Sequence, residues 1–127
     1  MNFTLTDYLA ADLPFGELRV SPDNAKGFRP LEMFVSAMAG CSSHVLKKIL
    51  EKKRVEFGEI TIAADVDRDA DRSNRIKRLV LDFSVNCSSK DFTNEQITQL
   101  EKLVLSNCGM LQTITDSADV QLSIKFL

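Results

Sequence analysis

The fold is decided by residues 30–54, which read PLEMFVSAMAGC (30–41) followed by SSHVLKKILEKKR (42–54). Pro30 suits the first turn of a helix, where its missing N–H costs no hydrogen bond. No further proline and only one glycine occur before Arg54. The first half of this stretch is apolar on nearly all sides, whereas the second half is amphipathic. We therefore predict a long helix from Leu31 to about Arg54, with a stripe made of Phe34, Met38, Cys41 and Val45.

The apolar first half of this helix has a consequence for assembly. A helix that is apolar all round must be covered on all sides. A chain of 127 residues with few other elements would struggle to provide that cover by itself. A second copy of the chain is the natural cover, so we expect a homodimer.

Shorter elements are predicted on both sides of the long helix. Residues 3–6 and 17–20 alternate weakly, as short edge strands do, and residues 21–27 form a loop by composition. Strands are predicted at 59–66, 76–85 and 120–126, with a turn-like charged stretch at 67–74. Thr93 and Gln96 form a capping box that opens a second helix. This helix is interrupted at 107–109, and a short third helix follows at about 110–114. The order is not a βαβ rhythm, so we expect an α+β fold with a largely antiparallel sheet.

The whole chain is expected to form one domain, residues 1–127, with a short arm at 1–28 and a core at 29–127. Its 18 acidic and 16 basic side chains give a net charge of -2, which argues against a nucleic-acid binder. No apolar run approaches the roughly 20 residues of a membrane span, and no secretory signal is visible. We therefore expect a cytoplasmic protein without a membrane or nucleic-acid partner.

Three cysteines and one histidine carry the candidate chemistry. Their spacing does not form a zinc set, so neither a metal nor a cofactor is expected. Cys41 is either a small buried hydrophobe or a reactive thiol, and His44, one turn further on, is either its base or a polar residue at the helix border. Cys108 either packs inward at a turn or lies at a helix N-terminus that stabilises its thiolate. Cys87, before a loop, is interpreted as an exposed bystander.

The long helix and the segments after it resemble the OsmC/Ohr proteins. The likeness rests on Pro30 to Phe34, on Ala39-Gly40-Cys41-Ser42, and on Asn107-Cys108-Gly109-Met110-Leu111 in its proper order, and it covers about residues 29–127. It implies an intertwined homodimer with long central helices and sheets outside. It also implies a thiol-dependent peroxidase that reduces small organic hydroperoxides, in which Cys41 attacks and Cys108 resolves. An external thiol would then reduce the disulfide.

The resemblance further implies a glutamate and an arginine near the reactive thiol. The family's glutamate directly follows the proline, but that position is Leu31 here and the acid comes one residue later, at Glu32. Arg19 and Arg29 are both candidates for the arginine. Glu32 precedes Cys41 by about 13 Å along a helix axis, so such a constellation must draw on the second subunit. The alternative hypothesis is a non-catalytic OsmC-like dimer that binds a small apolar or thiol-reactive ligand at its interface.

Overall fold

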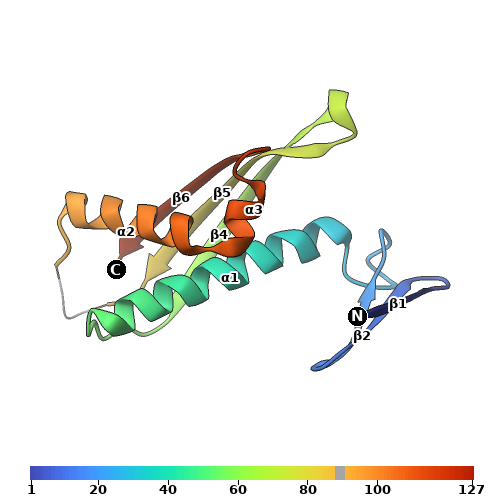
Figure 1. Cartoon of the computed structure of the whole chain (residues 1–127), viewed down its shortest axis with the longest axis horizontal. Coiled ribbons are helices and arrows are strands. Elements are labelled where there is room, and N and C mark those ends of the chain that lie inside the picture. The colour runs from blue at the N-terminus through green and yellow to red at the C-terminus, as the bar shows by residue number, and fades with distance from the viewer. Residues whose placement is uncertain (88–90) are drawn as a thin grey trace. The chain divides into compact units, whose positions relative to one another are not determined.

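The computed structural model describes residues 1–87 and 91–127. The chain divides into two compact units, Met1–Ala37 and Met38–Leu127, and each is described by itself (Figure 1). Each unit contains a three-stranded sheet, and helix α1 (Pro30–Lys52) begins in the first unit and continues in the second. The expected α+β class is therefore confirmed. No helix within the described residues is both long enough and apolar enough to cross a membrane.

The first unit contains an antiparallel sheet of β1 (Asn2–Leu5), β2 (Leu9–Leu13) and β3 (Gly16–Val20), in that order. The sequence predicted β1 and β3 but missed β2, because its Ala-Ala-Asp centre has low strand propensity. Gly27 lies directly against β3, since a Cβ there would come within 2.7 Å of the Arg19 carbonyl oxygen. This close approach lets the Phe28 N–H donate to that oxygen at 2.9 Å.

The second unit is built on a sheet of β4 (Ile60–Asp69), β5 (Arg75–Val85) and β6 (Asp119–Phe126). β4 and β5 are antiparallel, whereas β6 runs parallel to β5. β4 extends three residues beyond the predicted end at 66 and is followed by a 3₁₀ turn, Ala70–Arg72. The charged residues 67–69 were interpreted as a turn, but they pair with β5 across a bulge.

The parallel pairing of β5 and β6 requires a crossover. Helices α2 (Asn94–Asn107) and α3 (Gly109–Ile114) lie on the chain between these two strands (Figure 1). The predicted capping box is present, because the Thr93 hydroxyl accepts from the Gln96 N–H at 3.2 Å and the Gln96 side chain accepts from the Thr93 N–H at 3.0 Å. The capping box therefore fixes where α2 begins.

The core of the second unit is formed by buried side chains of α1, α2, α3, β5 and β6. The alternating residues Leu79, Leu81, Phe83 and Val85 are all buried, as their period of two predicted. The buried residues of α1 are Met38, Ser42, Leu46 and Leu50. Of the stripe described in the sequence, Met38 is buried, Cys41 and Val45 are half-buried, and Phe34 is exposed. Ser42 concealed this face in the sequence, because it is polar. Its hydroxyl is satisfied in the core by donating to the Met38 carbonyl oxygen at 2.7 Å.

Candidate functional site

Cys41 lies on α1 beside the buried face of this helix, and its side chain is half-buried. The preceding residue, Gly40, has open space where a Cβ would stand. Ser42, the next residue, is fully buried. The thiol of Cys41 is therefore held at the edge of the core rather than inside it, and it is not part of a disulfide.

Cys108 lies at the junction between α2 and α3 and is fully buried. Its extended backbone, with φ -90° and ψ 105°, ends α2 and allows α3 to start at Gly109. Its N–H donates to the Val104 carbonyl oxygen at 3.0 Å, and its carbonyl oxygen accepts from the Gln112 N–H at 2.9 Å. This junction is therefore fixed by backbone hydrogen bonds on both sides of the cysteine.

The fold brings Cys41 to this junction. The backbone N–H of Met110 donates to the Cys41 sulfur and lowers the pKa of this thiol, and the Cys108 S–H and the Gly109 N–H do the same. Desolvation opposes this shift but does not outweigh it. Cys41 is therefore the thiol with the greater thiolate character, which is the nucleophilic form of cysteine.

Cys108 has the opposite tendency. Burial raises the pKa of the Cys108 thiol, and the neighbouring Cys41 raises it further. Of the two alternatives left open for Cys108, the buried side chain agrees with inward packing, and the amides of α3 lower the Cys108 pKa by less than burial raises it. Amides at the start of α3 bond both sulfurs: Met110 and Gly109 act on Cys41, and Leu111 and Met110 act on Cys108, where burial outweighs them. The break in the helical pattern at Asn107-Cys108-Gly109 was the sequence signal that a new helix starts directly after Cys108.

Glu32 and Arg29 form an exposed ion pair in the first unit. The Arg29 Nε–H donates to Glu32 Oε1 at 2.8 Å, and a second guanidinium N–H bonds the same oxygen. This hydrogen bonding lowers the pKa of the Glu32 carboxyl. The structure thus brings together two of the residues that the sequence singled out. That Glu32 and Arg29 act on Cys41 stays a prediction.

Arg19 has different partners within the same unit. Its Nε–H donates to Glu17 Oε1 at 2.6 Å, and its guanidinium lies 4.7 Å from the centroid of the Tyr8 ring. The hydrogen bond to Glu17 raises the pKa of Arg19 above its ordinary value. Both groups next to Arg19 therefore favour its charged form and hold it on β3.

His44 agrees with its interpretation as a polar residue at the helix border, whereas Cys87 differs from its interpretation. The Nδ1–H of His44 donates to the Gly40 carbonyl oxygen at 2.7 Å, so this ring nitrogen is turned to the backbone. Cys87 was expected to be exposed but is only 8% exposed, and its S–H donates to the Glu56 carbonyl oxygen at 3.3 Å. It is buried because it continues the apolar alternation of β5 one step beyond Val85. The following residues, 88–90, lie outside the described part of the chain.

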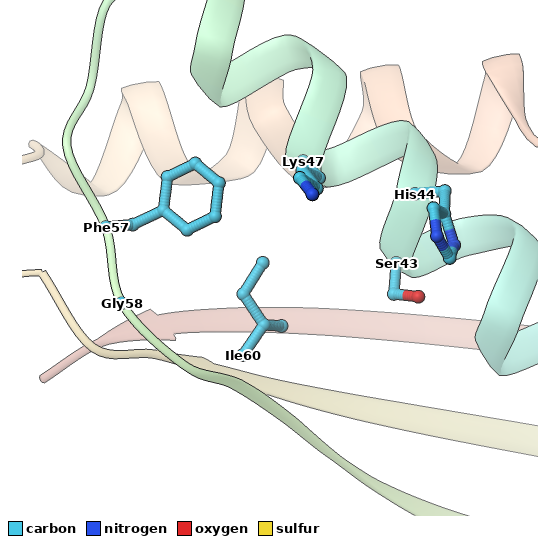
Figure 2. A pocket seen from close by; sticks show the side chains of 6 residues that line it. All are labelled: Ser43, His44, Lys47, Phe57, Gly58 and Ile60. Atoms are coloured by element: carbon cyan, nitrogen blue, oxygen red, sulfur yellow. The ribbon is translucent and has the colours of Figure 1, made fainter.

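His44 lines a pocket of about 250 Å³ on the second unit. Figure 2 shows Ser43, His44 and Lys47 on α1, facing Phe57, Gly58 and Ile60 on the segment that leads into β4. This pocket could not be predicted from the sequence, because nothing in the spacing of residues 57–60 indicates which side of α1 they face. Among the described residues, no group of three or more His, Cys, Asp or Glu side chains is arranged to hold a metal ion.

Comparison with known proteins identifies the family. The family model for OsmC-like protein matches residues 23–123 of the chain. This chain belongs to the OsmC-like family. The resemblance seen in the sequence is thus confirmed. A search of curated proteins finds no match to this OsmC-like chain.

Solved structures show the same OsmC-like fold. A hypothetical protein from Aquifex aeolicus VF5 is similar with a TM-score of 0.84 at 19% identity, covering 99% of this chain and 93% of the other. An OsmC-like protein from Mycoplasma pneumoniae has a TM-score of 0.84 at 14% identity, covering 99% and 94%. An organic hydroperoxide resistance protein from Elizabethkingia anophelis has a TM-score of 0.75 at 15% identity, also covering 99% and 94%.

Proposed function

We propose that this protein is a thiol-dependent peroxidase that reduces small organic hydroperoxides with Cys41 and Cys108. The observation that carries the proposal is the hydrogen bonding of Cys41 by the Met110 N–H and the Cys108 S–H, which lowers the pKa of Cys41. A nucleophilic thiol and a second thiol in contact with it are the two groups that such a reaction needs. Membership of the OsmC-like family supports the same activity.

The reaction proceeds in two steps. The Cys41 thiolate attacks one peroxide oxygen, a sulfur–oxygen bond forms, and the oxygen–oxygen bond breaks. The leaving alkoxide takes a proton and departs as the alcohol, which leaves Cys41 as a sulfenic acid. The sulfur of Cys108 then attacks the Cys41 sulfur, and the hydroxyl leaves with the Cys108 proton as water. The resulting disulfide is returned to two thiols by an external dithiol, which is oxidised to its own disulfide.

The raised pKa of Cys108 suits it to a supporting role in the first step. While Cys108 keeps its proton, it stabilises the Cys41 thiolate as a hydrogen-bond donor. A neighbouring thiol traps the sulfenic acid before it is oxidised further to the irreversible acids. Because the cycle depends on external thiol reduction, we propose the cytoplasm as the site of action.

The proposed enzyme is a homodimer in which Arg29 and Glu32 of the partner subunit approach Cys41. Large apolar side chains on the single chain support this assembly, since they would otherwise remain in water. They include Phe3, Leu5, Phe15, Phe28 and Phe34. We assign the role of the activating arginine to Arg29 rather than Arg19, because Arg29 is paired with Glu32. The family resemblance implies an arginine and a glutamate near the reactive thiol.

The proposal is tested with reduced protein and one equivalent of cumene hydroperoxide, followed by disulfide mapping by mass spectrometry. We expect a Cys41–Cys108 disulfide; in Cys108→Ser we expect one equivalent to give a sulfenic acid on Cys41 and excess hydroperoxide to give sulfinic and sulfonic acid there. Cys87→Ser is the matched control, because this cysteine is also buried but bonds the Glu56 carbonyl oxygen, and it should leave the disulfide unchanged. If Cys41 and Cys108 both stay reduced in excess peroxide, the peroxidase proposal fails and the non-catalytic, ligand-binding dimer is the better account.

A further inference from the structure

The pocket between α1 and residues 57–60 is lined by residues that have no role in the proposed peroxidase reaction. It measures about 250 Å³ and is lined by Ser43, His44 and Lys47 on one side and by Phe57, Gly58 and Ile60 on the other (Figure 2). Pockets for drug-sized ligands usually enclose about 300–1,000 Å³. The occupant of this pocket is therefore a smaller molecule, of about one ring.

Lys47 gives the pocket a positive charge that the described protein does not neutralise. Ion pairs within 4.0 Å in residues 1–87 and 91–127 involve Arg19, Arg29 and Arg78, and none involves Lys47. The Ser43 hydroxyl donates to the Gly40 carbonyl oxygen at 3.0 Å, and the His44 Nδ1–H donates to the same oxygen. The protons of both neighbours are thus engaged. The Lys47 ammonium is left as the principal donor to a ligand.

The opposite wall is apolar and is fixed by backbone hydrogen bonds. The ring of Phe57 and the side chain of Ile60 point toward α1, and both are only half-buried (Figure 2). The Gly58 N–H donates to the Asn86 carbonyl oxygen at 2.8 Å, and the Asn86 N–H donates to the Glu59 carbonyl oxygen at 3.0 Å. These bonds hold the wall in place without a ligand. An apolar body placed against it would remove apolar surface from water.

We propose that this pocket binds a small monocarboxylate with a compact apolar body, of the size of an aromatic acid. The carboxylate accepts a charge-assisted hydrogen bond from the Lys47 ammonium, and the apolar body lies against Phe57 and Ile60. A single cation matches a single negative charge. Phosphate-rich ligands need several donors or an arginine fork, and the lining residues provide neither.

The inference goes beyond the proposed peroxidase function and does not depend on it. Binding uses Lys47, Phe57 and Ile60, and Cys41 is not among the lining residues. Cys41→Ser is therefore expected to bind the carboxylate as the wild type does. Failure of carboxylate binding would leave the peroxidase test unaffected, and the reverse also holds.

The first test compares three probes on the full chain by two-dimensional NMR of backbone amides. Benzoate has both the charge and the ring, benzamide has the ring without the charge, and acetate has the charge without the ring. We expect saturable shifts at residues 43–47 and 57–60 with benzoate in the millimolar range or below. We expect benzamide and acetate to bind at least about tenfold more weakly. Equal binding of all three probes, no saturation, or shifts confined to other residues would overturn the proposal.

The second test uses matched lysine variants. Lys47→Met removes the charge but keeps an apolar stem, and it should weaken benzoate binding about tenfold. Lys47→Arg should keep most of the affinity. Lys48→Met is the control, because Lys48 is the next residue of the same helix, is exposed and does not line the pocket. If Lys48→Met weakens binding as much as Lys47→Met, the attraction is a general effect of surface charge and the site is rejected.

Discussion

The Cys108 S–H donates a hydrogen bond to the sulfur of Cys41, and this contact separates the pKa values of the two thiols. Backbone amides of Met110 and Gly109 add to the stabilisation of the Cys41 thiolate, whereas burial keeps Cys108 protonated. Two residues of the same type, 67 positions apart in the chain, thus acquire different chemical properties, because hydrogen bonds outweigh desolvation at Cys41 whereas desolvation outweighs hydrogen bonds at Cys108. This difference predicts which thiol reacts first.

Alkylation by iodoacetamide should report this difference. The rate at Cys41 should follow a titration with a midpoint below the ordinary thiol value of about 8.5. Cys108→Ala removes the S–H donor, so the Cys41 midpoint should rise, but only in part, since the Met110 and Gly109 amides remain. The measurement is mass spectrometry of alkylated peptides between pH 5 and 10. A Cys41 midpoint at or above the ordinary value in the wild type would contradict the assignment.

The same pKa shift has a consequence for stability. Because the folded pKa of Cys41 is below its unfolded value, the ionised thiol stabilises the fold above the unfolded pKa of about 8.5. This contribution is lost as the pH falls through the folded pKa. The unfolding free energy of the wild type relative to Cys41→Ser should therefore increase as the pH rises from below the folded pKa to the unfolded pKa of about 8.5. A flat difference in urea unfolding across this range would argue against a stabilised thiolate.

The ion pair of Arg29 and Glu32 should influence reactivity rather than folding. Arg29→Met should slow peroxide oxidation of Cys41 by about tenfold or more, because a cation lowers the pKa of a nearby thiol. Glu32→Gln should slow it less and should leave dimerisation intact. Arg19→Met is the control, because Arg19 is held by Glu17 and Tyr8. Stopped-flow oxidation measures the rates, and a larger loss in Arg19→Met would transfer the role to that residue.

The Thr93 cap tests a feature that was predicted from local sequence alone. Thr93→Ala removes the acceptor for the Gln96 N–H and should lower the unfolding free energy by about 1 kcal/mol. Thr98→Ala is the matched control, since its hydroxyl donates within the same helix to the Asn94 carbonyl oxygen at 2.9 Å and caps nothing. It should change stability by less than about 0.5 kcal/mol. Equal losses in urea titrations would show that the cap does not stabilise α2.

Local patterns predicted the elements whose determinants lie within a few residues. The Thr93 capping box, the alternation of β5 and the break at Cys108 all follow from neighbouring side chains. The long helix was also correct, because its apolar and charged halves contain no breaker apart from Gly40. Where a prediction needed only backbone propensity and side-chain spacing, the sequence was sufficient.

Predictions that depend on tertiary contacts were less successful. The place of Ser42 on the buried face of α1 was not predicted, because its hydroxyl is satisfied by a backbone oxygen that the sequence does not reveal as its partner. β2 forms because two neighbouring strands pair with it, despite its weak propensity. The meeting of Cys41 with Cys108 follows from the crossover of α2 and α3, and only the family resemblance had suggested it. The pocket at Lys47 could not be predicted from local patterns, because its second wall depends on the path that residues 57–60 take past α1.

The exposed apolar residues lead to the prediction on assembly. Phe34 is 39% exposed on α1, although it lies in the most apolar part of the chain. A homodimer that covers it should bury more than about 1,600 Å² in total. Light scattering at micromolar concentration should then give twice the 14.2 kDa mass of one chain. Phe34→Glu should weaken the dimer by at least about tenfold, because a charge would be buried in an apolar interface. Lys48→Glu, an exposed change on the same helix, should leave the dimer intact. A single-chain mass for the wild type with native circular dichroism would refute the dimer.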